Sequence, residues 1–399
     1  MTTTINNEHK KLNVPNLRFK EFEGEWSVTT LQKDCIVNPT NEKIADKFVY
    51  VDLESVKQGQ LYKYQILTKD NAPSRAQRVL HTDDILFQCV RPYQMNNYMV
   101  KGTMSDIQWV ASTGYAQIRT QTDYPAFLYY VLNTSKYNKA VMVRCTGSSY
   151  PAINSEDLSK IPFYKCGIAE QKKIADFLSL LDERIATQNK VIEDLKKLKS
   201  AIIDYVINSL NTDFAKFGSL YEMAGEGGTP TTSNASFYDN GKIPFIKIDD
   251  LKKKYLTENK DFITELGLQK SSAWLVPTHS ILFSNGATIG EISITTYPVC
   301  TKQGILGIVP KQNIDVEFLY YFMSSSYFKK AVSRIVTEGT MKTAYLKDIN
   351  NILCPIPTKE KQQEIAKIPS ALNSKIDFEQ SILKLFCSQK QYLLRQMFI

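Results

Sequence analysis

Three kinds of residue in this chain could support catalysis: a glycine-rich stretch, three histidines and several acidic pairs. The stretch GEGGTPTTS (225–233) lacks the lysine with which a GxxxxGK[ST] loop reaches phosphates, so we interpret it as a loop that enters a strand. His9, His81 and His279 have no partners at the spacing of a metal or triad site, and a solvated face explains pairs such as Asp83–Asp84. No strand–GxGxxG–helix unit is present to bind a dinucleotide or S-adenosylmethionine. We therefore predict a binding protein with no catalytic and no metal-ligating residues.

Polar residues in six loops have side chains that could hydrogen-bond to nucleic acid. Arg recognises guanine, Asn and Gln recognise adenine, and Ser and Thr recognise either, whereas Lys, Arg and small polar turns contact phosphates. The loops are 89–97, 112–115, 144–150, 283–290, 300–304 and 337–342. The DNA-binding candidates are Arg91, Tyr93, Gln94, Asn96, Thr113, Tyr115, Arg144, Ser148, Ser149, Ser284, Asn285, Thr288, Lys302, Gln303, Thr340 and Lys342. We predict base contacts for Arg91, Tyr93, Gln94, Ser284, Asn285 and Thr288; for each residue, an ordinary solvated turn is the alternative.

The chain that carries these loops is duplicated. FLYYVLNTSKYNKAV (127–141) recurs as FLYYFMSSSYFKKAV (318–332), at an offset of 191 residues. DILF (84–87) recurs as SILF (280–283), at an offset of 196 residues. Such a long period excludes a solenoid and indicates one module of about 190 residues in two tandem copies.

Each copy is predicted to have a mixed part followed by one long helix. Short β-rich runs punctuated by Gly, Pro, Asn and Asp predict strands within 47–53, 84–90, 115–120, 243–248 and 304–310. One helix is expected at 125–141 and its counterpart at 316–332, and the long helices are expected at 168–210 and 360–399.

The long helices have an apolar seam at positions spaced alternately four and three residues apart. This spacing is typical of the a and d positions of a coiled coil, and polar interruptions fall at the same seam positions in both copies. The helix-pairing candidates are Ile174, Leu178, Leu181, Ile185, Ile192, Leu195, Ile202, Leu372, Ile376, Leu383, Phe386 and Leu393. Pro369 is expected to kink or restart the second helix.

Composition limits the class of protein. The 399 residues include 49 Lys+Arg and 41 Asp+Glu, a net charge of +8 that permits a nucleic-acid partner without requiring one. No apolar run approaches the roughly 18–20 residues that cross a bilayer, and the N-terminus has no signal-like apolar region. The seven Cys are scattered without a CxxC pair, so we expect reduced thiols and a cytoplasmic protein.

These features together predict an α+β protein with an internal pseudo-two-fold repeat. The predicted parts are a recognition domain at 1–165, a central helix at 166–210, a second recognition domain at 211–356 and a distal helix at 357–399. Antiparallel pairing of the helices would hold two similar β-rich domains a fixed distance apart. That arrangement suits a reader of two half-sites on duplex DNA, where one helical turn is about 34 Å.

Motifs along the whole chain resemble the specificity (S) subunits of type I restriction–modification enzymes, the HsdS family. PNLRFKEFEGEW (15–26) is similar to that family's start, and SILFSNGATIG (280–290) is similar to a recurring signature of its target-recognition domains. AEQKKIADFLSLLDERI (169–185) looks like the start of its central conserved helix. PIPTKEKQQEIA (355–366) looks like the distal counterpart, with Lys361 where the family usually has Glu.

The resemblance implies a non-catalytic subunit of a bacterial, cytoplasmic complex. One S subunit would bind two methyltransferase (M) subunits and two restriction (R) subunits, and each recognition domain would read half of a bipartite target in double-stranded DNA. The M subunits would use S-adenosylmethionine, the R subunits would use ATP and Mg, and this chain would bind no cofactor. The alternatives are a self-contained methyltransferase, a coiled-coil structural tether and a DNA-binding adaptor outside type I systems.

Overall fold

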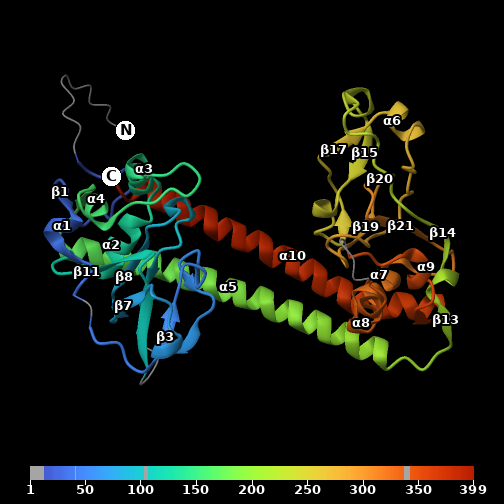
Figure 1. The fold of residues 1–399 in the computed structure, drawn as a ribbon, viewed down its shortest axis with the longest axis horizontal. Coiled ribbons are helices and arrows are strands. Elements are labelled where there is room, and N and C mark those ends of the chain that lie inside the picture. Colours follow the sequence, from blue (N-terminus) through green and yellow to red (C-terminus); the bar gives the residue numbers. More distant parts are fainter. Residues whose placement is uncertain (1–12, 41, 103–106, 337–341) are drawn as a thin grey trace. The chain divides into compact units, whose positions relative to one another are not determined.

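The computed structural model describes residues 13–40, 42–102, 107–336 and 342–399, which form two compact units. The first unit extends to Gln188 and includes Ile382–Ile399, and the second is Asn189–Ser381. Each unit holds a mixed domain and a segment of each of two long helices, α5 (Ile168–Asn208) and α10 (Lys359–Gln396) (Figure 1). We call the part before α5 the first domain and the part between α5 and α10 the second domain. The predicted mixture of helix and sheet is confirmed.

The first domain is built on two four-stranded sheets. One has the order β6–β3–β10–β7, with β3 and β10 parallel; the other has the order β2–β11–β8–β9 and is antiparallel. β1 also pairs with β12, and β4 pairs with β5. The strands are β1 (Ser27–Thr30), β2 (Cys35–Val37), β3 (Lys47–Val51), β4 (Val56–Lys57), β5 (Gln60–Leu61), β6 (Gln65–Thr68), β7 (Ala76–Leu80), β8 (Ile85–Gln88), β9 (Tyr98–Met99), β10 (Gln108–Ser112), β11 (Tyr115–Thr120) and β12 (Pro162–Lys165).

The second domain has a five-stranded sheet, β14–β21–β18–β19–β16, and a three-stranded sheet, β17–β15–β20, while β13 pairs with β22. Ile281 lies opposite Ile308 between β18 and β21, as Ile85 lies opposite Ile118 between β8 and β11. The duplicated sequence therefore folds into the same strand pair twice. The strands are β13 (Phe214–Lys216), β14 (Tyr221–Glu226), β15 (Ile243–Ile246), β16 (Tyr255–Leu256), β17 (Asp261–Ile263), β18 (Ile281–Ser284), β19 (Ile292–Thr295), β20 (Cys300–Thr301), β21 (Ile305–Pro310) and β22 (Leu353–Pro355).

The single helix predicted after the sheet strands is wrong in both copies, because two helices form there. Thr134 Oγ1 accepts a hydrogen bond from Tyr137 N, and Ser325 Oγ accepts one from Phe328 N, each at 3.2 Å. These N-caps begin a new helix inside the predicted one. The helices are α2 (Pro125–Leu132), α3 (Ser135–Arg144), α7 (Val316–Ser324) and α8 (Ser326–Ile335), with short α1 (Leu31–Asp34), α4 (Ser155–Ser159), α6 (Glu265–Gln269) and α9 (Leu346–Ile349).

Each domain shares its hydrophobic core with the long helices. The FLYY residues, 127–130 and 318–321, are buried. The first core also contains Ile174, Leu178, Leu393 and Met397, and the second contains Ile203, Ile207 and Ala366. Because burying one large aliphatic side chain stabilises a fold by roughly 1.5–3 kcal/mol, the helix ends are integral to both domains.

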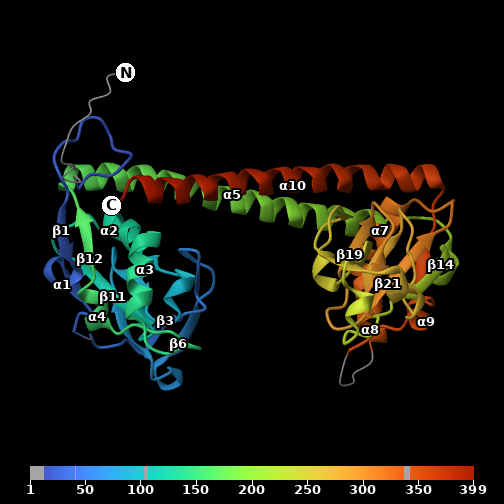
Figure 2. The same cartoon turned by 90° about the horizontal axis from the view of Figure 1, so that it is seen from above.

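All twelve predicted helix-pairing residues are buried or half-buried. In the first unit, Lys390 Nζ lies 2.5 Å from Asp182 Oδ1, and the Arg184 guanidinium lies over the Phe386 ring. The start of α5 and the end of α10 therefore run in opposite directions there, side by side in Figures 1 and 2. In the second unit, Lys199 Nζ donates to Asn373 Oδ1 at 2.9 Å.

Helix α10 continues through Pro369, so the restart predicted there is wrong. Proline removes one backbone donor from the helix, but Pro369 is buried against the rest of the second unit. Among the described residues, no helix is long and apolar enough to cross a membrane.

Candidate nucleic-acid interface

The three candidate loops of the first domain meet at the end of β8. Cys89, the residue after β8, donates its N–H to Gly114 O at 3.0 Å and accepts at its carbonyl from Ile153 N, also at 3.0 Å. Loop 89–97 is thereby joined to the β10–β11 turn and to the segment that follows α3. The backbones of these loops therefore lie beside one another.

The second domain repeats this loop junction, by which we mean the backbone hydrogen bonds that join the loops at the residue after the strand. Asn285 N donates to Gly304 O at 2.9 Å, and Asn285 O accepts from Ala344 N at 2.8 Å. In the repeat, Asn285 corresponds to Cys89 and Ala344 corresponds to Ile153. Equivalent backbone bonds thus join the described loop segments in each domain; of the predicted loop 337–342, only Lys342 lies within the described residues.

Asp84 anchors the strand that leads into the first group of loops. Its carboxylate is fully buried and accepts hydrogen bonds from His81 N, Gln117 Nε2 and two nitrogens of Arg119, at 2.7–2.9 Å. The solvated face predicted for Asp83–Asp84 is therefore wrong at Asp84. The hydrogen bond to this carboxylate raises the pKa of Arg119. The second domain has Ser280 at this position, and the buried Ser280 hydroxyl has no hydrogen-bond partner among the described residues.

Of the predicted readers in loop 89–97, Tyr93 and Gln94 are exposed and Arg91 is half-buried. Arg91 has a left-handed backbone (φ 53°), and its guanidinium lies 4.5 Å from the ring centre of Tyr150. Tyr93 is 52% exposed. Gln94, which ends the 3-10 turn Pro92–Gln94, accepts a hydrogen bond from Gln88 Nε2 at 2.8 Å. This surface combines an arginine, aromatic rings and an amide, which are the groups that bind bases and phosphates.

The remaining candidates of this domain differ in availability. Ser148 and Ser149 are exposed, and Thr113 is half-buried at the β10–β11 turn. Arg144 is exposed and donates to Ala140 O within its own helix. Asn96 already accepts from Gln58 N at 3.1 Å through its side-chain oxygen.

In the second domain, Thr288, Lys302, Gln303 and Lys342 are exposed. The backbone of Lys302 donates to Ile246 O, which leaves its side chain at the surface. Thr340 lies outside the described residues. Exposed lysine, glutamine and threonine side chains therefore surround the second junction.

Three predicted contacts are wrong because their side chains point into the protein. Tyr115 is 1% exposed, its hydroxyl donates to Asp52 O at 3.2 Å, and burial raises its pKa. Ser284 is buried, donates to Thr288 O and accepts from Glu291 N. Asn285 is 1% exposed and its amide donates to Ala344 O. These residues shape the loops and cannot reach a base.

Two residues beside these loops were not predicted as site residues: Tyr150 in the first domain and Thr229 in the second. Tyr150 is 64% exposed beneath Arg91, and its position at the end of the GSSY turn was the available signal. The GEGGTPTTS stretch begins in the last two residues of β14 and leaves that strand instead of entering one, and Thr229 Oγ1 accepts a hydrogen bond from Gln303 N. A Cβ on Gly227 would lie 2.2 Å from Thr301 O, so only glycine permits this approach.

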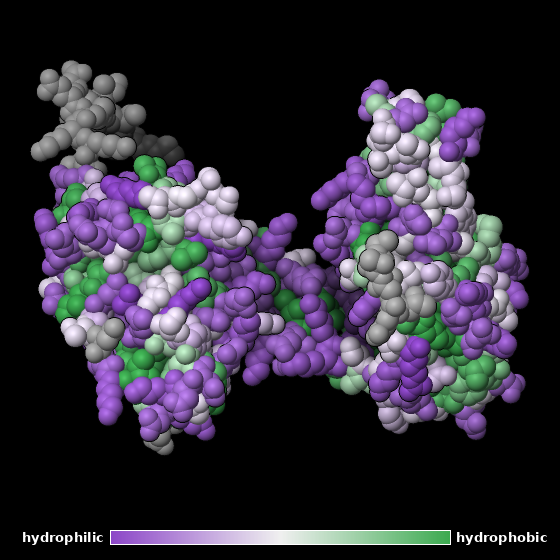
Figure 3. Space-filling view, viewed as in Figure 1, coloured by the Kyte–Doolittle hydropathy of each residue, from purple (hydrophilic) through white to green (hydrophobic). Residues whose placement is uncertain are grey.

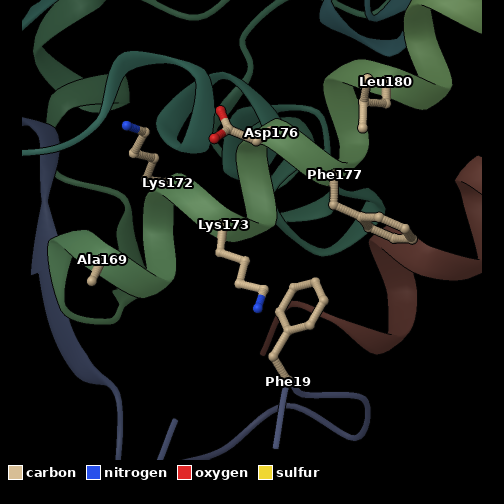
Figure 4. A pocket seen from close by; sticks show the side chains of 7 residues that line it. All are labelled: Phe19, Ala169, Lys172, Lys173, Asp176, Phe177 and Leu180. Carbon is tan, nitrogen blue, oxygen red and sulfur yellow. The ribbon is translucent and has the colours of Figure 1, made fainter. Parts of the chain in front are cut away.

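A pocket of about 440 Å³ lies elsewhere, on the first turns of α5 (Figure 4). The rings of Phe19 and Phe177 meet edge to face at 5.9 Å, and the Lys173 ammonium lies 5.0 Å from the Phe19 ring centre. Three charged side chains, Lys172, Lys173 and Asp176, line the pocket together with apolar ones. In the described parts of the chain, no group of three or more His, Cys, Asp and Glu side chains could hold a metal ion.

Hydrophilic side chains cover most of the face of each unit drawn in Figure 3.

The family model of the type I restriction modification DNA specificity domain matches the chain twice, at residues 36–197 and 211–385. The type I restriction enzyme HindI specificity subunit of Haemophilus influenzae is 21% identical, over 75% of this chain and 79% of that protein. The putative type I restriction enzyme MjaX specificity subunit of Methanocaldococcus jannaschii is 23% identical, over 93% and 92%. The crystal structure of a type I S subunit from M. genitalium shares the fold, with a TM-score of 0.57 and 17% identity over 97% of this chain and 99% of that one.

Proposed function

Since this chain belongs to the family of type I restriction–modification specificity proteins, we propose that it is the subunit that selects the DNA sequence on which such a complex acts. Each domain reads one half of a bipartite target. The observation that carries this proposal is the loop junction, built twice by equivalent backbone bonds at Cys89 and Asn285. The junctions share a framework but display different side chains, so the two half-sites differ in sequence.

The displayed groups support direct reading of bases. An arginine held above an aromatic ring, as Arg91 is above Tyr150, is oriented before DNA arrives, which lowers the conformational entropy lost on binding. Lys302 and Gln303 offer a cation and an amide in the second domain. The modest net charge of +8 fits a subunit that shares DNA binding with larger partners.

Helices α5 and α10 are proposed to pair as an antiparallel coiled coil with pseudo-two-fold symmetry and to set the gap between the half-sites. Two cross-helix contacts support this: Lys390 with Asp182, and Lys199 with Asn373. The repeat relates each lysine to the other, and relates Asp182 to Asn373. Polar residues at such seam positions specify the register of a helix pair.

The outer faces of the same helices are proposed to dock two methyltransferase (M) and two restriction (R) subunits. Exposed apolar residues recur every seven positions on each helix, which places them on one face. They are Val191, Leu198 and Tyr205 on α5 and Phe378, Leu385 and Tyr392 on α10, each 39–74% exposed. Such exposed stripes mark protein interaction sites. The M subunits would supply S-adenosylmethionine chemistry and the R subunits ATP and Mg chemistry, so this chain itself has no catalytic role.

A domain exchange tests this function. The chain is co-expressed with its M subunits, and residues 1–165 are replaced by the corresponding part of another specificity protein. We expect methylome sequencing to show adenine methylation within one split target, with one half-site changed and the other half-site and the gap retained. The reciprocal exchange of residues 211–356 is the matched control and should change the opposite half. A change in both halves, or in neither, would contradict the two-reader model.

A further inference from the structure

A short hairpin of the first domain has the shape of a recognition ribbon. Strands β4 and β5 pair Val56 with Leu61 and Lys57 with Gln60. The two turn residues, Gln58 and Gly59, have φ angles of 52° and 77°. Two left-handed residues in a two-residue loop are typical of a type I′ turn, whose twist matches that of the strands. The backbone at the tip of the hairpin therefore has one defined conformation.

Three contacts hold this hairpin beside loop 89–97. Val56 is 2% exposed and belongs to a hydrophobic core of the first domain. Gln58 N donates to Asn96 Oδ1 at 3.1 Å, and Asn96 N in turn donates to Gln88 Oε1 of β8 at 3.1 Å. A Cβ on Gly59 would lie 2.3 Å from the Tyr129 hydroxyl, so the turn sits directly on α2. The hairpin is thus joined to the same strand that presents Arg91.

The side chains at the tip are polar and free of the core. Lys57, Gln58 and Gln60 are all exposed. The major groove of DNA admits a two-stranded ribbon, and the glutamine amide can bond to both the N6 amino group and N7 of adenine. A lysine on the ribbon can contact a phosphate. We propose that the β4–β5 hairpin reads bases of the half-site recognised by the first domain, through Gln58 and Gln60, with Lys57 on the DNA backbone.

Asn96 takes a different role from the DNA contact predicted for it. Its side-chain oxygen is engaged by the hairpin, so Asn96 is a positioning residue for Gln58 and not itself a base reader. The second domain has no such hairpin among its described residues: after β15, the counterpart of β3, the chain forms β16, which joins the five-stranded sheet beside β19. The hairpin therefore affects one half-site only.

This inference rests on the proposed function and is tested in the complex with the M subunits. The variants are Gln58→Ala, Gln60→Ala and Lys57→Ala, and the matched control is Gln32→Ala, an exposed glutamine on α1 outside the loop group. Methylation rates are measured on duplexes in which each base pair of the target is varied in turn. A single mismatch in a specific site costs about 1–3 kcal/mol, so losing its reader should reduce discrimination there roughly 5- to 150-fold.

We expect the glutamine variants to lose discrimination at one or two positions of one half-site, with the other half-site and the Gln32→Ala control unchanged. Lys57→Ala should weaken binding to all DNA sequences alike, and it should reduce the slope of log K against log salt concentration by about one. Unchanged discrimination in both glutamine variants, or an equal loss in both half-sites, would overturn the hairpin assignment. If the wild-type complex methylates no split target, the proposed function fails instead, so the two failures are distinguishable.

Discussion

Asp84→Asn is the substitution whose consequence the structure defines best. The Asp84 carboxylate is fully buried immediately before β8 and accepts four hydrogen bonds, two of them from the Arg119 guanidinium. Asparagine keeps the shape but has one acceptor oxygen, and its amide nitrogen would face donors. We therefore expect the substitution to destabilise the first domain without changing its fold.

The magnitude follows from the bonds that are lost. Removing one partner of a buried ion pair costs about 3–5 kcal/mol when the remaining charge stays buried. The Arg119 side chain is 33% exposed, so water can solvate part of the charge that remains. We expect the free energy of unfolding of the first domain to fall by about 3 kcal/mol, which is the lower end of that range.

Native-state hydrogen exchange measures this loss in the full chain. The slowest amides of β8 and β11 report the first domain, and those of β18 and β21 report the second domain in the same sample. The matched control is Ser280→Ala at the equivalent position, where removing a buried unpaired hydroxyl should change stability by less than about 0.5 kcal/mol. A loss below about 1 kcal/mol for Asp84→Asn, or an equal loss in both domains, would refute the reasoning.

Replacing each of the two seam lysines with leucine should change the free energy of unfolding in opposite directions. Lys390→Leu removes the ion-pair partner of Asp182 and should lower the free energy of unfolding by about 1 kcal/mol. Burial lowers the pKa of Lys199, so Lys199→Leu should raise stability by about 1 kcal/mol; urea unfolding tests both, and shifts of the same sign would contradict the prediction. Burial alone would raise the pKa of Glu317, but hydrogen bonds, the largest from Lys254, hold it below its ordinary value of 4.5. Stability from Glu317 is therefore fully present above pH 4.5 and lost as the pH falls through the lowered pKa, so the melting-temperature difference between wild type and Glu317→Gln should shrink below that pH.

Local sequence patterns were sufficient to predict the repeat, the strands and the long helices. The seam positions of α5 and α10 follow from apolar spacing because helical periodicity is set by neighbouring residues. The same reasoning missed the break before Thr134, where a single capping hydroxyl starts a new helix. It also failed at Tyr115, which begins β11 at the residue expected for the strand but points its ring into the protein instead of toward DNA.

By itself the sequence determined that two similar modules carry polar loops and paired helices, because duplication and periodicity are readable along the chain. Only the tertiary structure decided which loop residues are available to a partner. Arg91 meets Tyr150, and Gln58 meets Asn96, across long stretches of intervening chain. Such meetings depend on sheet register and backbone hydrogen bonds between distant strands. One such long-range bond, from the Asn285 amide to Ala344 O, holds Asn285 inside the protein, whereas Tyr93 and Lys302 lie at the surface.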